Sequence, residues 1–93
     1  MVVGTLIVSL RLYGAQSLKD KRRVIKSLVD RMRQKFNASV AEVDCLDLWQ
    51  RAELGIAVVG HESAHVSSQL QRIASFIDLD GSVEVIGVQT ELL

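Results

Sequence analysis

The chain has 93 residues, a hydrophobic content of 48% and a formal net charge of zero at pH 7. This length predicts a single domain over residues 1–93 with one compact core. Proline is absent and the glycines are scattered, so no linker or internal repeat divides the chain. The single cysteine, Cys45, excludes an intramolecular disulfide and any CxxC metal or redox motif, and we expect a buried core thiol.

The apolar start of the chain (MVVGTLIVSLRL) does not have the features of a targeting or membrane segment. It lacks the basic stretch that opens a signal peptide. Arg11 interrupts it well before the ~20 apolar residues that are needed to cross a bilayer. We therefore expect a cytoplasmic protein with no membrane partner.

The first two elements expected along the chain are a strand and a helix. Apolar residues at every second position predict a strand over residues 2–13. Ser17 then suits a helix N-cap, and Asp20 completes a capping-box-like Ser-x-x-Asp pattern. Six apolar residues fall within about 100° of one another around a helix, which predicts an amphipathic helix up to Asn37; they are Leu18, Ile25, Leu28, Val29, Met32 and Phe36.

Two further strands joined by a turn are expected next. Residues 40–45 alternate between two faces, and Val40, Glu42 and Asp44 form the face expected to meet solvent. Apolar residues at every second position predict a third strand over residues 52–58. Apart from Glu53, the opposite face of this third strand carries small side chains, namely Gly55, Ala57 and Val59.

A helix and a strand complete the predicted elements. A helix over residues 63–77 is predicted by an apolar stripe at helical spacing, made of Val66, Leu70, Ile73 and Ile77. Asp80 and Gly81 suit a turn, and residues 82–90 suit a final strand with an irregular, bulged pattern.

The order of these elements predicts an α+β, ferredoxin-like βαββαβ sandwich. Two right-handed βαβ crossovers around a central hairpin give a four-stranded antiparallel sheet with both helices on one face. The other face is left uncovered and is expected to carry the apolar residues Ile7, Val40, Ala57 and Val59. An exposed apolar face of this kind is typical of a homodimer or a protein-interaction surface.

Charge is distributed very unevenly. Residues 17–36 hold eight Lys and Arg against two acids, which gives +6, while three Lys and Arg against nine acids give −6 elsewhere. Cations in the first turn of a helix oppose the helix dipole, so local stability does not explain the cluster. A basic helix attracts anions. The candidate anion-binding residues are Lys19, Lys21, Arg22, Arg23, Lys26 and Arg33.

Three interpretations of this basic helix stay open. It could be a solvated surface, a contact for RNA or a ribosomal subunit, or a site for a small phosphorylated ligand. The third strand has no aromatic residue, so base stacking as in an RNA-recognition motif is not expected, and the GxxG loop of KH domains is missing. Nucleic-acid binding would therefore depend on phosphates and on salt.

The segment from His61 to His65 matches the metalloprotease motif H-E-x-x-H, in which both histidines lie on one face of a helix. Here the preceding strand and Gly60 place His61 at a strand-to-helix junction, with Ser63 as the helix cap. We therefore expect no metal site. There is no P-loop, GxGxxG or nucleophile constellation either, so neither a cofactor nor catalysis is expected.

Trp49 and Arg51 lie at the edge of the predicted hairpin. A tryptophan there is a packing anchor or an interface residue, and both interpretations stay open.

Several segments resemble a known family. Ser17-Leu18-Lys19-x-Lys21-Arg22, Lys35-Phe36-Asn37 through Glu42 and Trp49-Gln50-Arg51-Ala52 are similar to the YlxP-like family of small bacterial proteins of unknown function. The resemblance runs over nearly the whole chain. It implies a ferredoxin-like fold and, because genes of this family often neighbour those of translation factors, a role near translation or ribosome maturation. It supplies no catalytic residues.

Overall fold

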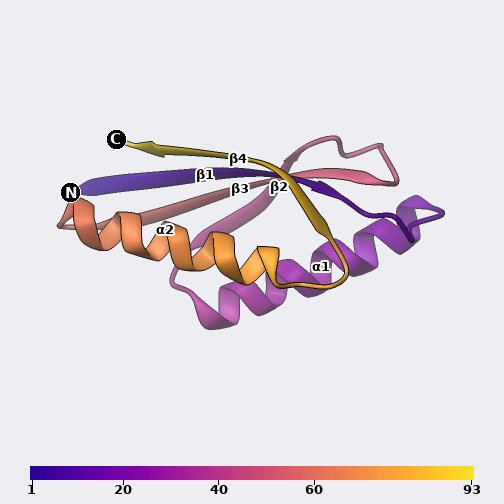
Figure 1. Cartoon of the computed structure of the whole chain (residues 1–93), viewed down its shortest axis with the longest axis horizontal. Helices are drawn as coiled ribbons and strands as arrows, with labels where there is room; N and C mark the ends of the chain where they lie inside the picture. Colours follow the sequence, from indigo (N-terminus) through magenta and orange to yellow (C-terminus); the bar gives the residue numbers. More distant parts are fainter.

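The computed structural model describes all 93 residues and contains the six predicted elements in the predicted order (Figure 1). They are β1 (Val2–Arg11), α1 (Leu18–Lys35), β2 (Ser39–Asp44), β3 (Arg51–Gly60), α2 (Ser63–Asp78) and β4 (Glu84–Leu92). The strand β1 ends earlier than its periodicity suggests, at Arg11, and β4 begins later, at Glu84. In both places the chain forms a turn instead of continuing the sheet pairing.

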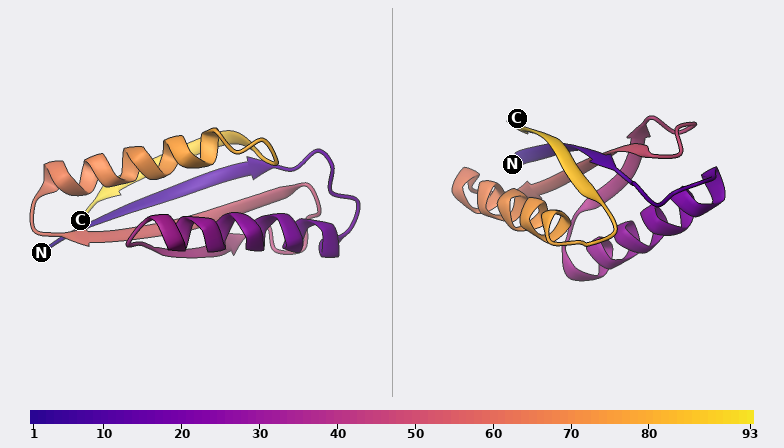
Figure 2. Two further views of the ribbon diagram at one scale, coloured as in Figure 1. Left: turned by 90° about the horizontal axis from the view of Figure 1, so that it is seen from below. Right: turned by 45° about the vertical axis from the view of Figure 1, so that its right-hand side comes forward.

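The four strands form one antiparallel sheet in the order β2-β3-β1-β4. Both helices lie on the same side of this sheet, as the views in Figures 1 and 2 show. The register between β1 and β4 shifts after Ser9, which pairs with Gly87 while Leu10 pairs with Val85. Ile86 is thus the extra residue of the predicted bulge. The ferredoxin-like fold is confirmed.

The core lies between the sheet and the two helices. Alternate residues of β1 and β3, from Leu6 to Leu10 and from Ala52 to Val58, are buried against the apolar stripes of α1 and α2. Gly4 of β1 permits the close approach of α2, because a β-carbon there would stand 2.5 Å from a methyl group of Val66. Both helices are amphipathic, and neither is long and apolar enough to cross a membrane.

The first helix begins as its sequence predicts. Ser17 is the N-cap, and its hydroxyl accepts a hydrogen bond from the backbone N–H of Asp20 at 3.0 Å. The Asp20 carboxylate in turn accepts the backbone N–H of Gln16 at 3.1 Å, one residue earlier than in a standard capping box. The second helix differs from the prediction, since its N-cap is Glu62 rather than Ser63 and no side chain caps it.

The predicted orientation of β2 is wrong. Val40 faces the helices and is buried in the core, because it pairs with the core residue Ile56 of β3. Glu42 also points to the helix side, whereas Ala41 and Val43 lie on the uncovered face. Both faces of this short strand carry apolar residues, so alternation alone could not decide which one is buried.

Cys45 is not the core thiol that the sequence predicts. It follows β2 directly, is only partly buried, and has a positive φ of 59°. Its backbone turns the chain out of the sheet into the β2–β3 loop, residues 45–50. A left-handed conformation is uncommon for a residue other than glycine and indicates that neighbouring contacts hold this bend.

Candidate functional site

The exposed cations of α1 lie along one flank of the helix, which we name the basic stripe. At about 100° per residue, they occupy an arc of about 100° around the helix axis. All are exposed, and they are Lys19, Arg22, Arg23, Lys26 and Arg33. Near the end of α1 this flank lies beside β2, since the Arg33 guanidinium donates a hydrogen bond to the carbonyl oxygen of Val40 at 2.6 Å. These five predicted residues are thus exposed together on one flank of α1.

The stripe is not neutralised by neighbouring acids. Lys26 forms an exposed i,i+4 ion pair with Asp30 at 2.9 Å, and exposed pairs of this kind are weak. Lys19, Arg22 and Arg23 have no acidic partner within ion-pair distance. No ion pair therefore engages these three cations near the start of α1.

Lys21 does not belong to the basic stripe, and its inclusion among the anion-binding residues is wrong. Its side chain is 1% exposed, and its Nζ lies 2.7 Å from Oε2 of Glu42. That carboxylate oxygen is itself buried and has no aligned hydrogen bond, so the contact is an ion pair. The same Nζ donates a hydrogen bond to the carbonyl oxygen of Cys45 at 2.5 Å. A buried and paired ammonium cannot meet an external phosphate.

The position of Lys21 follows from helical spacing. It lies four residues before Ile25 and seven before Leu28, which are both buried in the core. Its apolar stem covers the core while its ammonium reaches the end of β2. Lys21 therefore joins α1 to β2 and holds the left-handed turn at Cys45.

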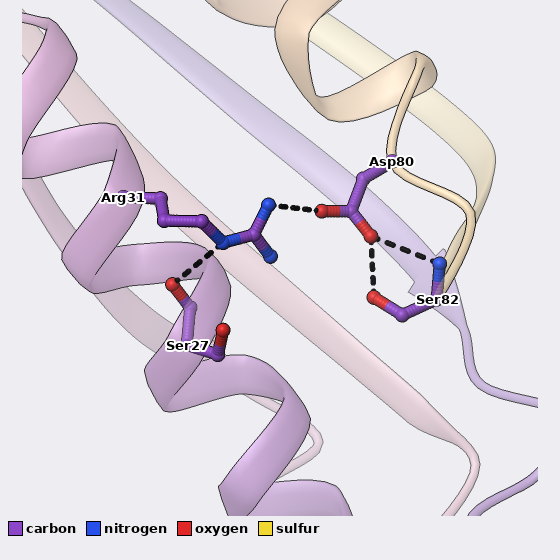
Figure 3. Close-up of polar contacts among 4 residues, drawn as sticks. All are labelled: Ser27, Arg31, Asp80 and Ser82. Carbon is purple, nitrogen blue, oxygen red and sulfur yellow. Dashed lines mark hydrogen bonds and ion pairs between the residues drawn. The ribbon is translucent and has the colours of Figure 1, made fainter.

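A second paired cation, Arg31, joins α1 to the turn that follows α2 (Figure 3). Arg31 Nη1 lies 2.7 Å from Oδ2 of Asp80, and Arg31 Nε donates to the carbonyl oxygen of Ser27. The backbone N–H and the hydroxyl of Ser82 both donate to Oδ1 of Asp80. Burial alone would raise the pKa of Asp80, but the hydrogen bonds from Ser82 and the Arg31 guanidinium outweigh it, so the pKa is lowered.

The start of α1 also borders a hollow of about 750 Å³. Its lining includes Arg11 and Arg23, together with the carboxylates Asp20 and Glu84. The hydrogen bond that Arg11 donates to the Tyr13 hydroxyl raises the pKa of this guanidinium further. Two cations against two carboxylates leave the hollow neutral, and Asp20 already occupies the helix N-terminus. This arrangement does not favour a small phosphorylated ligand.

The other predicted interface residues lie in two places. Ile7, Ala57 and Val59 are on the uncovered sheet face, and Val59 is 60% exposed. Trp49 and Arg51 lie at the β2–β3 loop and the start of β3, both exposed. Dimerisation or protein binding through the sheet face stays a prediction.

The two histidines are separated as the sequence predicts. His61 precedes α2 and contacts Glu62, whereas His65 lies within the first turn of the helix. They are therefore not in one helical register. No three His, Cys, Asp or Glu side chains gather in a metal-ligand group.

Sequence reasoning missed an apolar cluster in the β2–β3 loop. Leu46 and Leu48 are half-exposed, next to the half-exposed Trp49. The sequence does contain an indication of this cluster, since three large apolar residues stand within a short segment that otherwise has the composition of a turn. They are exposed because the loop lies outside both the paired strands and the core.

Comparison with known proteins agrees with the fold and defines the family. Residues 3–90 match the model of the family described as protein of unknown function (DUF503). The chain belongs to this family. It is 40% identical over 80 residues to the uncharacterized protein YlxP of Bacillus subtilis (strain 168), a match that covers 86% of this chain and 87% of YlxP. The resemblance to YlxP-like proteins that the sequence indicated is confirmed by this match.

A solved structure supports the architecture. The de novo designed protein Foldit4 is similar in structure, with a TM-score of 0.54, and the match covers 98% of this chain and 97% of the designed one. At 20% identity this likeness shows the fold alone. Any function of this DUF503 member has to be argued from its own side chains.

Proposed function

We propose that this protein is a non-enzymatic module that binds the phosphate backbone of RNA through the basic stripe of α1. The observation that supports it most directly is the presence of three exposed cations without acidic partners, Lys19, Arg22 and Arg23, on one flank of one helix. A solvated surface needs no such segregation. The remaining interpretation, a small phosphorylated ligand, has less support because the adjacent hollow is neutral.

The distribution of charge across the molecule favours a polyanionic ligand. The segment that contains α1 is strongly positive, and the rest of the chain is equally negative. Such a molecule orients α1 toward an anionic surface while the acidic remainder disfavours nonspecific wrapping. Binding through phosphates positions an RNA without reading its sequence.

The length of the stripe suits a linear ligand. Lys19 and Arg33 are separated by 14 residues, or about 21 Å along the helix axis. That distance is long enough to follow the backbone of several nucleotides but is larger than a single phosphate requires. A polymer is therefore a better match than a mononucleotide.

The proposal is tested by binding of a short labelled single-stranded RNA, measured by fluorescence anisotropy over a range of salt concentrations. Replacing Lys19, Arg22 and Arg23 with Gln should weaken binding at least about tenfold at low salt. It should also reduce the salt dependence, because three lost contacts to a single strand lower the slope of log K against log salt by about 2.

A second triple variant controls for net charge. Replacing Arg11, Lys35 and Arg72 with Gln removes three cations that lie outside the basic stripe. This control should retain most of the affinity and the original salt slope. Equal losses in both variants would show that net charge alone governs binding and would refute the stripe as the site.

A further inference from the structure

The β2–β3 loop exposes an unusual amount of apolar surface. Leu46, Leu48 and Trp49 are 57%, 50% and 52% exposed. Large apolar residues that cluster in a solvent-facing loop lose the benefit of burial, and such clusters commonly mark a binding surface. Nothing in the fold of the domain itself requires them there, because the core is complete without them.

This loop is held firmly in spite of its exposure. Lys21 anchors the carbonyl of Cys45, and the N–H of Leu48 donates back to that same carbonyl at 3.1 Å. At the other end, the side-chain amide of Gln50 donates to the carbonyl of Ala15 at 3.0 Å. The backbone carbonyl of Gln50 accepts the N–H of Leu12 at 2.9 Å. Trp49 is therefore presented on a fixed backbone, which lowers the entropic cost of binding.

The loop lies beside the start of the basic stripe. Its anchors are Lys21, which directly precedes Arg22, and Ala15, which lies just before the helix cap Ser17. Figures 1 and 2 both place the β2–β3 connection at the same end of the molecule as the first turn of α1. The loop that carries the exposed Trp49 thus lies at the same end of α1 as the unpaired cations Lys19 and Arg22.

The chemistry around Trp49 suits a nucleobase better than a phosphate. The indole lines a shallow cavity with Leu48 and with the polar residues Asp47, Gln50 and Arg51. One acid and one base leave the cavity without net charge, and the Asp47 carboxylate would repel a phosphate. A flat, neutral ring with hydrogen-bond donors and acceptors matches an indole surrounded by a carboxylate, an amide and a guanidinium.

We propose that Trp49 stacks on an unpaired base of the RNA whose backbone follows the basic stripe. This inference rests on the proposed function and narrows its ligand to single-stranded or looped RNA, because bases inside a duplex do not expose their faces. Proteins that bind single strands combine a cationic track with aromatic stacking in this way. Here the aromatic group comes from a loop and leaves the uncovered sheet face unused.

Trp49 is the only tryptophan of the chain, so its fluorescence reports on this site alone. The protein is titrated with a short single-stranded RNA, with the same sequence as a duplex, and with inorganic polyphosphate, which carries charge but no bases. The single-stranded RNA should quench Trp49 emission at saturation. The duplex and the polyphosphate should bind through the stripe at low salt with little quenching.

Substitution of Trp49 sharpens the test. Trp49→Ala should weaken binding of the single strand by about 5- to 150-fold while leaving polyphosphate affinity unchanged. Trp49→Phe keeps a stacking surface and should retain most of the affinity, and its thermal unfolding shows whether the loop is intact. Equal quenching by polyphosphate, or an equal loss of affinity for both ligands in Trp49→Ala, would overturn the inference.

Failure of the stacking inference is distinguishable from failure of the proposed function. If single-stranded RNA binds with the expected salt slope but does not change Trp49 emission, the basic stripe binds RNA and Trp49 does not. If neither RNA nor polyphosphate binds at low salt, both proposals are wrong. If Trp49 emission changes with protein concentration instead, the loop is a contact between copies of the chain, and the stacking inference is again wrong.

Discussion

The two flanks of α1 carry the same kind of residue and use it in opposite ways. On the inner side, Lys21 and Arg31 are paired with Glu42 and Asp80 and join the helix to β2 and to the turn after α2. On the outer side, cations such as Arg22 have no acidic partner. The Lys and Arg residues that cluster in the sequence of α1 therefore divide into cations that pair within the fold and cations that are free to bind a ligand. Acidic partners on other elements of the fold separate the two groups, whereas residue type does not.

This comparison predicts that the inner cations determine stability and the outer ones determine binding. The distinction is tested by substituting residues of each group and comparing the effect on stability. Each of the following changes is measured as a difference in the free energy of unfolding, obtained from urea denaturation of the purified protein.

The largest loss of stability is expected for Lys21→Met. This change leaves the Glu42 carboxylate without its partner and frees the carbonyl of Cys45. Breaking a buried ion pair from one side costs about 3–5 kcal/mol, and we expect about 3 kcal/mol because Glu42 keeps some contact with solvent.

The matched control for this change is the double variant Lys21→Met, Glu42→Leu. Replacing both charges with apolar residues of similar size removes the uncompensated carboxylate, and such replacements are often neutral. The double variant should therefore recover most of the lost stability. A single Lys21→Met variant as stable as the parent would show that the ion pair does not hold β2 and the loop.

A smaller and pH-dependent loss is expected for Asp80→Asn. The carboxylate accepts two hydrogen bonds from Ser82 and pairs with Arg31, so its removal at neutral pH should cost about 1–2 kcal/mol. Because the folded pKa is below the unfolded one, this stabilisation is complete above the ordinary carboxyl pKa. It is lost as the pH falls through the folded pKa.

The free energies of unfolding of the parent and Asp80→Asn should therefore differ at neutral pH, and this difference should become smaller in acid. Urea denaturation at a series of pH values measures this directly. A difference in the free energy of unfolding that stays constant down to strongly acidic pH would show that the charge of the Asp80 carboxylate does not contribute to stability.

The smallest effect is expected for the outer flank. Replacing Lys19, Arg22 and Arg23 with Gln removes no ion pair. Stability should rise slightly, by at most about 0.3–1 kcal/mol, because Lys19 in the first turn opposes the helix dipole. A clear fall in stability would place these residues among the structural cations, and any loss of RNA binding would then need a different explanation.

Most of the fold could be predicted from the sequence because its patterns are strong and local. Alternation in β1 and β3, the apolar stripe of α2 and the Ser17 cap each follow from spacing along the chain. The bulge at Ile86, near the start of β4, also appeared as an interrupted pattern. The order of these elements then leaves few topologies that place both helices on one face.

The errors arose where a pattern had two solutions. The strand β2 has apolar residues on both faces, and only its pairing with β3 decides that Val40 is inside. Lys21 was assigned to the surface by its charge, although its spacing from Ile25 places it on the core face of the helix. Its partner Glu42 lies on another element, so the pair could not be read from local sequence.

The candidate site was predictable in part. The basic stripe followed from the density of Lys and Arg in one amphipathic helix, where the face opposite the core must be exposed. The proximity of the β2–β3 loop to the start of that helix depends on the anchors from Gln50 and Lys21. Those contacts join segments that are far apart in the chain, so they cannot be predicted from the spacing of apolar residues within one segment.

The order of strands also has a consequence for how the molecule forms during synthesis. The strand β1 is made first and lies inside the finished sheet, but one of its two neighbours is β4, the last strand to be made. Until residues 84–92 have left the ribosome, one edge of β1 is unpaired and can join to another strand. The sheet of a nascent chain thus closes late, when its two most distant segments meet.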